Sequence, residues 1–204
     1  LPVLSKAFKM KNVKKISDIQ NKSFELSLIF SIPASFGLIL ASNEIVNALF
    51  GYGSFSPNDV EMTAEALKFF GYGVPAFALI KILSNFFFAR DNTKIPFYIS
   101  TLIVFLNISI SISFFSKIGF IIIPIATSLS TWIGVFIYIY LLNSKKILLL
   151  RNQLKINFIK IMISTIIMSS ILLFSLDKFA NYLDYSNNYK AVYLISIISF
   201  VGIF

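Results

Sequence analysis

The chain has 204 residues, of which 57% are hydrophobic and only 13% are charged. Ordinary soluble domains carry about 25% charged residues, so this composition, with a mean hydropathy of +0.82, predicts an all-α integral membrane protein. The net charge of +9 does not indicate nucleic-acid binding, because the basic residues cluster between apolar stretches.

Several kinds of enzyme are excluded by residue types that the chain lacks. It contains no cysteine and no histidine, which removes thiolate nucleophiles, imidazole acid–base chemistry and the usual zinc sites. Phosphate-binding glycine loops and the common hydrolase motifs do not occur either. We therefore expect no enzyme, no cofactor and no firm metal site.

Residues 1–22 form the first of three predicted divisions, followed by 23–145 and 146–204. The apolar residues of this first segment recur at near-helical spacing. It also contains a series of lysines: Lys6, Lys9, Lys11, Lys14, Lys15 and Lys22. This pattern is typical of a short amphipathic helix on an anionic membrane surface. A solvated basic linker is the alternative.

The first predicted span covers 24–50 and has Pro33 near its middle, where a proline kinks a membrane helix. The stretch 51–59 has the glycine, proline, serine and asparagine content of a turn. Ser56 or Asn58 is suited to cap the helix that follows.

The second predicted span, 69–88, is almost wholly apolar and contains one formal charge, Lys81. A cation at that depth costs about 2.5–3.5 kcal/mol on insertion scales, so it usually faces protein or a water-filled cavity. Small and polar residues share its helical face. They are Gly71, Pro75, Ala78, Lys81 and Asn85. The alternative is that Lys81 extends to the nearer headgroups and has no specific role.

The third and fourth spans are predicted at 96–115 and 120–142, with Pro124 near the start of the fourth. Asn107 and Ser111 share a polar face of the third span, which most often joins helices by hydrogen bonds. Ala126, Ser130 and Gly134 recur every fourth residue in the fourth span. This spacing lets another backbone approach closely.

A basic loop is predicted at 143–160, a fifth span at 161–176 and a polar, tyrosine-bearing loop at 177–188. A sixth span begins at 189 and is incomplete. Because the first residue is not methionine and the last apolar run is short, we expect the chain to be a fragment of a longer protein.

The loops sort into two sets according to charge. Six lysines of 1–22, two basic residues of 90–95 and five of 143–160 fall in one set, out of 18 basic residues in all. The other set contains 51–59, Lys117 and 177–188. The positive-inside rule predicts that the first set is cytoplasmic. The two sets alternate along the chain, which supports six spans.

Three stretches resemble the lipid II flippases known as MurJ or MviN, of the multidrug/oligosaccharidyl-lipid/polysaccharide exporter superfamily. They are LPVLS at the start, SIPASFGLILASNEIVNALFGYGSF in the first span and turn, and LIKILSNFFFARDNTKIP at the end of the second span. The resemblance covers 1 to about 142, and beyond Lys145 only hydropathy and span count match.

The resemblance implies a fold of fourteen transmembrane helices, of which this chain carries the last six. Its first four helices would complete a lobe that pairs with an N-terminal lobe absent from this sequence. The last two would flank a groove for a polyprenyl tail. The implied activity is to move lipid-linked peptidoglycan precursor, lipid II, from the cytoplasmic to the outer leaflet of the bacterial inner membrane.

Site residues follow from the same resemblance. Lys81 falls where the family has a lysine in the corresponding helix. Some members resemble sodium binders in this lobe, and Asn107 and Thr127 match such ligands, with Ser111 where a carboxylate is wanted. We treat these three residues as candidate sodium ligands, with helix packing as the default interpretation.

A flippase must give a large anionic headgroup a hydrated, cationic path, and Lys81 with Asn85 is suited to line it. Candidate hinge or kink positions are Pro33, Gly73, Pro75 and Pro124. Since no ATP-binding motif occurs, membrane potential or a sodium gradient is the expected energy source. The alternatives are a polysaccharide-repeat or drug exporter of the same superfamily, and a non-transporting membrane scaffold.

Overall fold

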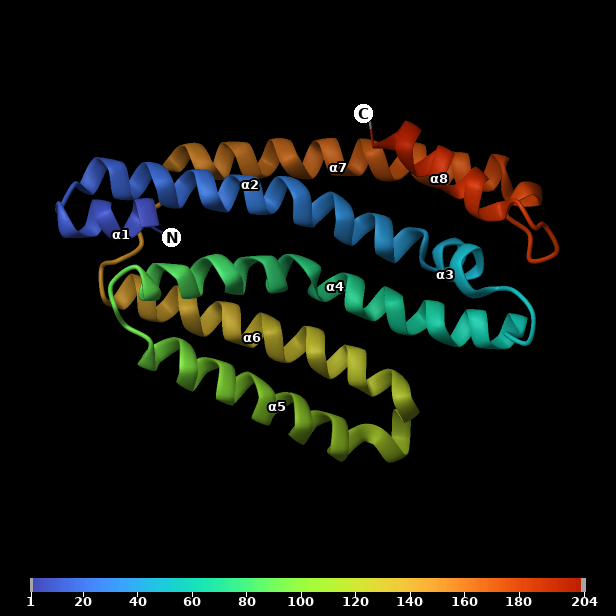
Figure 1. Cartoon of the computed structure of the whole chain (residues 1–204), viewed down its shortest axis with the longest axis horizontal. Helices are drawn as coiled ribbons and strands as arrows, with labels where there is room; N and C mark the ends of the chain where they lie inside the picture. Colours follow the sequence, from blue (N-terminus) through green and yellow to red (C-terminus); the bar gives the residue numbers. More distant parts are fainter. Residues whose placement is uncertain (1, 203–204) are drawn as a thin grey trace.

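The computed structural model describes residues 2–202, which form helices and no strand (Figure 1). The elements in chain order are α1 (Pro2–Lys9), α2 (Val13–Leu40), α3 (Ser42–Phe50), α4 (Pro57–Phe88), α5 (Lys94–Ile118), η1 (Gly119–Ile121), α6 (Ile122–Ser144), α7 (Asn152–Lys178), η2 (Ala180–Tyr182) and α8 (Lys190–Val201). The all-α prediction is confirmed.

Four stretches are long and apolar enough to cross a membrane: Val13–Leu40, Pro57–Phe88, Lys94–Ser144 and Asn152–Lys178. The third has 51 residues and comprises α5, η1 and α6, which fold back on each other as a hairpin (Figure 1). This arrangement gives five membrane-crossing helices. The sixth predicted span corresponds to α8, whose 12 residues extend only about 18 Å.

The helices lie side by side in a fixed order (Figure 1). α2 packs on α4, α4 on α6 and α6 on α5, while α7 packs on the other side of α2 and α8 contacts α7 and α3. We call α2, α4, α5 and α6 the lobe, and α7 with α8 the C-terminal pair. The predicted division at 145/146 falls in the segment that joins them.

The two sets of loops lie at opposite ends of the bundle (Figure 1). One end, here the basic end, contains α1, residues 89–93 and residues 145–151. The far end contains residues 51–56, η1 and residues 179–189. The alternation expected from the charge pattern is therefore present in the arrangement of the helices.

Two predicted boundaries in the N-terminal part of the chain are wrong. The first span is not one helix from 24 to 50, because α2 ends at Leu40 and α3 begins at Ser42. The segment 1–22 is likewise divided, since the Asn12 side chain accepts a hydrogen bond from Lys15 N (3.0 Å) and so caps α2. The amphipathic segment is therefore α1 together with the first turns of α2.

The basic loop is also shorter than predicted, because α7 already begins at Asn152.

The capping of α4 follows the expectation. The Ser56 side chain accepts from Asp59 N while the Asp59 carboxylate accepts from Ser56 N, which is a complete capping box.

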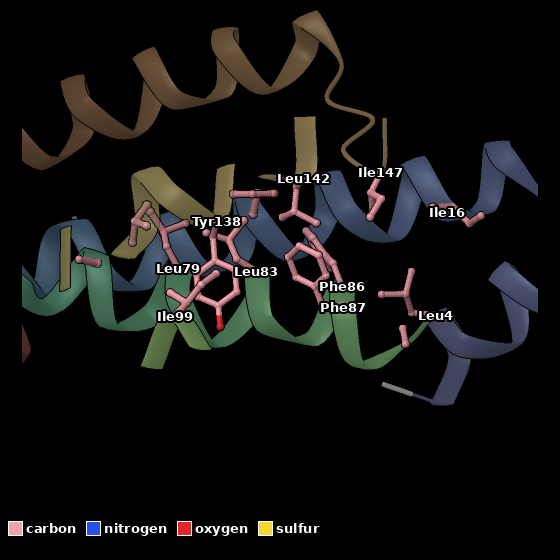
Figure 2. Packing of buried hydrophobic residues seen from close by; sticks show 14 of the residues in the cluster. Leu4, Ile16, Leu79, Leu83, Phe86, Phe87, Ile99, Tyr138, Leu142 and Ile147 are labelled. Atoms are coloured by element: carbon pink, nitrogen blue, oxygen red, sulfur yellow. The ribbon is translucent and has the colours of Figure 1, made fainter. Parts of the chain in front are cut away.

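The largest buried cluster lies toward the basic end and joins α4, α6 and α2 (Figure 2). Its centre contains Leu83, Phe87 and Tyr138, each almost fully buried. The predicted small-residue stripe of α6 supports this packing. A Cβ on Gly134 would lie 2.3 Å from Ile103 Cδ1 of α5, so a larger residue would require the Ile103 side chain to shift.

Candidate functional site

Lys81 lies on the side of α4 that faces away from its packing partners. α4 buries Phe86 against Phe24 of α2 and Phe87 against Tyr138 of α6, with ring centroids 5.8 and 5.9 Å apart. Lys81 itself is exposed, and its side chain makes no hydrogen bond or ion pair within residues 2–202. The ammonium is therefore available to a group outside the described part of the chain.

Asn85 follows Lys81 by one turn and is half-buried. Its side-chain amide has no hydrogen bond within the described residues. The small and polar residues predicted to share one face with Lys81 do not all lie on the open surface. Gly71 packs against α2, where a Cβ would lie 2.9 Å from Ile39 Cγ1. Lys81 and Asn85 thus form a short polar surface on an otherwise apolar helix.

Pro75 lies inside α4, which continues from Pro57 to Phe88 and is offset near its middle (Figure 1). Proline has no N–H, so the carbonyl of Gly71, four residues earlier, loses its helical donor. Ser35 Oγ of α2 donates to that carbonyl at 2.7 Å. A hydroxyl from a neighbouring helix therefore replaces the hydrogen bond that the proline removes.

The same bend is also contacted from α6. Ser128 Oγ donates to Phe69 O (2.7 Å) and Trp132 Nε1 donates to Tyr72 O (2.9 Å). Gly73 lies between these contacts, and a Cβ there would be 2.6 Å from Ser128 Oγ. Gly73 therefore serves close packing against α6.

The two remaining candidate hinge prolines have different positions. Pro33 is inside α2, as expected for a kink. Pro124 is the third residue of α6, in the first turn, where helical N–H groups have no intrahelical partner and proline is tolerated. Pro124 thus lies in the first turn of α6 and does not interrupt the helix.

The structure brings together two of the three candidate sodium ligands. Asn107 Nδ2 of α5 donates to Thr127 Oγ1 of α6 at 2.7 Å, and Thr127 Oγ1 donates to Ile123 O at 2.7 Å. Ser111 is one turn beyond Asn107, and its buried hydroxyl has no partner within the described residues. Since neither α5 nor α6 contains a carboxylate, these groups form a neutral polar contact between the two helices.

Two apolar cavities flank the C-terminal pair. One, of about 430 Å³, lies between α2, α7 and α8 and is lined by Pro33, Gly37, Met168, Leu172 and Val201 among others. A Cβ on Gly37 would meet nothing within 4 Å. The second, of about 650 Å³, lies between α7 and α8 beside Phe174 and Tyr193. Both cavities are suited to an apolar chain.

Sequence reasoning missed a set of polar contacts at the basic end, which we call the amide clasp. Gln20 of α2 is fully buried; its Nε2 donates to Ile147 O and its Oε1 accepts from Leu149 N, both at 3.0 Å. Asn21 binds the next groups in the same way, donating to Leu149 O (2.8 Å) and accepting from Arg151 N (2.9 Å). Ile147 O, Leu149 N, Leu149 O and Arg151 N make no backbone hydrogen bond within the described residues, and these side chains supply their partners.

Lys190 was missed as well. The sequence analysis assigned no role to this lysine, which stands at the beginning of the sixth apolar run. In the structure Lys190 is fully buried at the start of α8. The lysine next to the tyrosine-rich stretch 182–189 was the one available signal, because tyrosine faces attract cations.

Comparisons with known proteins agree across the chain. The family model described as "Lipid II flippase MurJ" matches residues 1–193. A protein of Rickettsia prowazekii named "Probable lipid II flippase MurJ" is 32% identical over 203 residues, which is 99% of this chain and 39% of the relative. A protein of Thermosipho africanus named "Lipid II flippase MurJ" is 34% identical over 137 residues, 67% of this chain and 28% of the relative.

A solved structure has the same helix arrangement. It is described as "Lipid II flippase MurJ, inward closed conformation" and matches with a TM-score of 0.73 and 28% identity, covering 98% of this chain and 40% of that chain. The chain thus spans about two fifths of the length of the Rickettsia relative and of this structure.

Proposed function

The chain belongs to the lipid II flippase MurJ family, and from this premise we propose that it is the C-terminal portion of a flippase. The proposed activity is to move lipid II from the cytoplasmic to the outer leaflet of the bacterial inner membrane by alternating access. The protein acts as a transporter and not as an enzyme. Its partners are lipid II, membrane lipids and the N-terminal lobe of the same protein.

The observation that carries this proposal is the free ammonium of Lys81 within the apolar stretch 69–88 of α4. Lys81 faces away from α2 and α6, and Asn85 lies beside it on the same open surface. A lipid-facing cation at this depth would cost about 2.5–3.5 kcal/mol, whereas a cavity between two lobes provides water and an anionic ligand. We therefore assign Lys81 to contact the pyrophosphate of lipid II as a compact positive charge.

The apolar part of the substrate has a matching surface in this proposal. The cavity between α2, α7 and α8 supports a role for the C-terminal pair in holding the polyprenyl tail. The open space at Gly37 favours the same use. The headgroup would follow Lys81 while the tail remains in contact with lipid.

Energy coupling and orientation belong to the same proposal. Membrane potential contributes about 2.3 kcal/mol per charge per 100 mV, which can act on the charge of Lys81 or on a bound Na⁺. Asn107, Thr127 and Ser111 are the candidate sodium ligands of this chain. We assign the basic end to the cytoplasmic side, because the positive-inside rule places the loops rich in lysine and arginine there.

Replacement of Lys81 by alanine in the full-length protein tests the proposal. Since contacts to charged groups contribute about 1.5–3 kcal/mol, lipid II flipping in proteoliposomes should fall about ten- to a hundredfold at unchanged protein level. Lys68→Ala is the matched control, because Lys68 is an exposed lysine of the same helix outside the apolar stretch. Unchanged flipping in Lys81→Ala would remove Lys81 from the transport path, and a wild-type protein that moves a different lipid-linked glycan would favour the exporter alternative.

A further inference from the structure

The ammonium of Lys190 is enclosed at the far end by groups from two segments, residues 51–52 and Tyr185. Lys190 has no exposed surface, and its Nζ donates to Gly51 O (2.6 Å) and to Tyr185 O (2.8 Å). The rings of Tyr52 and Tyr185 lie 4.3 and 4.6 Å from Nζ. A residue of α8 thus binds the segment that follows α3.

These groups suit a positive charge although none of them is a carboxylate. Gly51 is the C-cap of α3, so its carbonyl lies at the negative end of that helix. Two tyrosine faces add cation–π attraction, which is strongest where water is excluded. Asp184 is exposed and forms no ion pair within residues 2–202. The Ser186 hydroxyl and backbone N–H groups, with a smaller contribution from the charge of Lys190, hold the pKa of this carboxyl below its ordinary value.

The site has no spare room. A Cβ added to Gly51 would lie 2.3 Å from Asn47 Oδ1, 2.6 Å from the Asn47 carbonyl oxygen and 3.1 Å from Lys190 Nζ. The backbone at Gly51 has a φ of −70°, which any residue adopts, so glycine is needed here only for space.

Two further hydrogen bonds join the same segments. Asn47 Nδ2 of α3 donates to Leu183 O at 2.8 Å, and the Tyr185 hydroxyl donates to Phe55 O. Together with the Lys190 contacts these bonds connect α3 and residues 51–55 to residues 183–190. We call this set the ammonium clasp.

The position of the clasp determines what it controls. α4 begins at Pro57, directly after residues 51–56, and its capping box fixes that beginning. Lys81 lies about 36 Å further along the same helix. A displacement of residues 51–56 would therefore move the helix that carries Lys81.

We propose that Lys190 is a positioning residue that couples the C-terminal pair to α4 at the far end of the bundle. The buried ammonium keeps the turn between α3 and α4 docked on residues 183–190, so that α4 and α8 move as one body there. The docking itself is independent of the substrate, and only its effect on transport rests on the proposed function.

The experiment measures docking directly in the full-length protein in membranes. This chain has no cysteine, so spin labels at Ser54→Cys and Asn188→Cys report the distance across the clasp once any cysteines elsewhere are replaced. Lys190→Met keeps the length of the side chain and removes the charge. Because it leaves two buried carbonyls without donors, we expect the docked population to fall about ten- to a hundredfold and the distance distribution to broaden.

Three controls make the result specific. Lys178→Met removes an exposed lysine at the same end and should leave the distance unchanged. A second label pair at Arg90→Cys and Lys145→Cys, at the basic end, should stay constant in Lys190→Met, whereas general unfolding would change both pairs. Gly51→Ala should separate the far-end labels although Lys190 is still present.

The outcomes separate this inference from the proposed function. A narrow, wild-type distance in Lys190→Met would overturn the coupling role. If Lys190→Met does not accumulate in membranes, the far-end distance in Gly51→Ala is the test, and a narrow, wild-type distance in that variant would likewise overturn the coupling role. Loss of docking together with slower lipid II flipping supports both proposals, while loss of docking in a protein that never flips lipid II supports the clasp and contradicts the flippase assignment.

Discussion

The two clasps hold the C-terminal pair to the lobe by different chemistry. The amide clasp at the basic end uses neutral side chains, Gln20 and Asn21, to satisfy an irregular backbone segment. The ammonium clasp at the far end uses the charge of Lys190, enclosed by carbonyls and aromatic rings. A buried charge tolerates fewer arrangements of its neighbours than a neutral amide does, so the far end is the attachment with the stricter geometry.

Between the clasps, α2 and α7 are joined less firmly. The hydroxyls of Ser31, Thr165 and Ser169 are buried and have no hydrogen-bond partner within residues 2–202. The apolar cavity beside Gly37 and Leu172 lies at the same interface. The clasps thus hold the ends of the C-terminal pair, whereas its middle contacts α2 beside an apolar cavity and buried hydroxyls without partners among the described residues.

The amide clasp should show the largest effect on stability. Gln20→Leu leaves Ile147 O and Leu149 N buried without partners, which should cost about 2–4 kcal/mol in the free energy of unfolding. Thermal unfolding of the purified full-length protein in detergent measures this change. Gln153→Leu is the matched control, because Gln153 is exposed on α7 and its amide donates only to Asn157 of the same helix. Equal melting temperatures for the two variants would show that the clasp does not hold the pair.

A single hydroxyl of the ammonium clasp should matter less. Tyr185→Phe removes the hydrogen bond to Phe55 O but keeps the ring and the carbonyl that face Lys190. We expect a loss of about 1 kcal/mol, measured as above, with Tyr189→Phe as the exposed control. A loss as large as that of Gln20→Leu would mean that the hydroxyl, and not the ammonium, dominates the far end.

The smallest effect should come from the surface ion pair beside the amide clasp. Arg151 and Asp18 lie 2.5 Å apart, but both side chains are about half exposed, at 47% and 48%. Arg151→Ala should therefore cost about 0.2–1 kcal/mol, and the difference should shrink as salt is raised. An effect that is large and independent of salt would contradict this assignment and would add the Arg151 side chain to the clasp, which already includes its backbone N–H.

Length and hydropathy were enough to predict the five membrane-crossing helices, because an apolar run of about 20 residues has few other stable forms. The capping box at Ser56 and the small stripe of α6 were also readable, since both depend on local spacing. The break at Ala41 was not predicted, because no proline or glycine stands at that point to interrupt the apolar run.

The two clasps could not be predicted from local sequence patterns, because their partners are far apart in the sequence. Gln20 and Leu149 are 129 residues apart, and Lys190 and Gly51 are 139 residues apart. Which polar side chain meets which carbonyl over such separations depends on how the helices pack. By contrast, Asn107 and Thr127 were matched through family resemblance and lie 20 residues apart on adjoining helices.

The bend at Pro75 has a mechanical consequence. A proline whose freed carbonyl is solvated by water can flex, but here Ser35 braces one flank of the helix while Ser128 and Trp132 brace the other. Straightening α4 at Pro75 would disturb three hydrogen bonds that are donated by side chains of two separate helices. We therefore expect a displacement of α4 at Pro57 to be carried along the helix toward Lys81 and not to be absorbed at the bend.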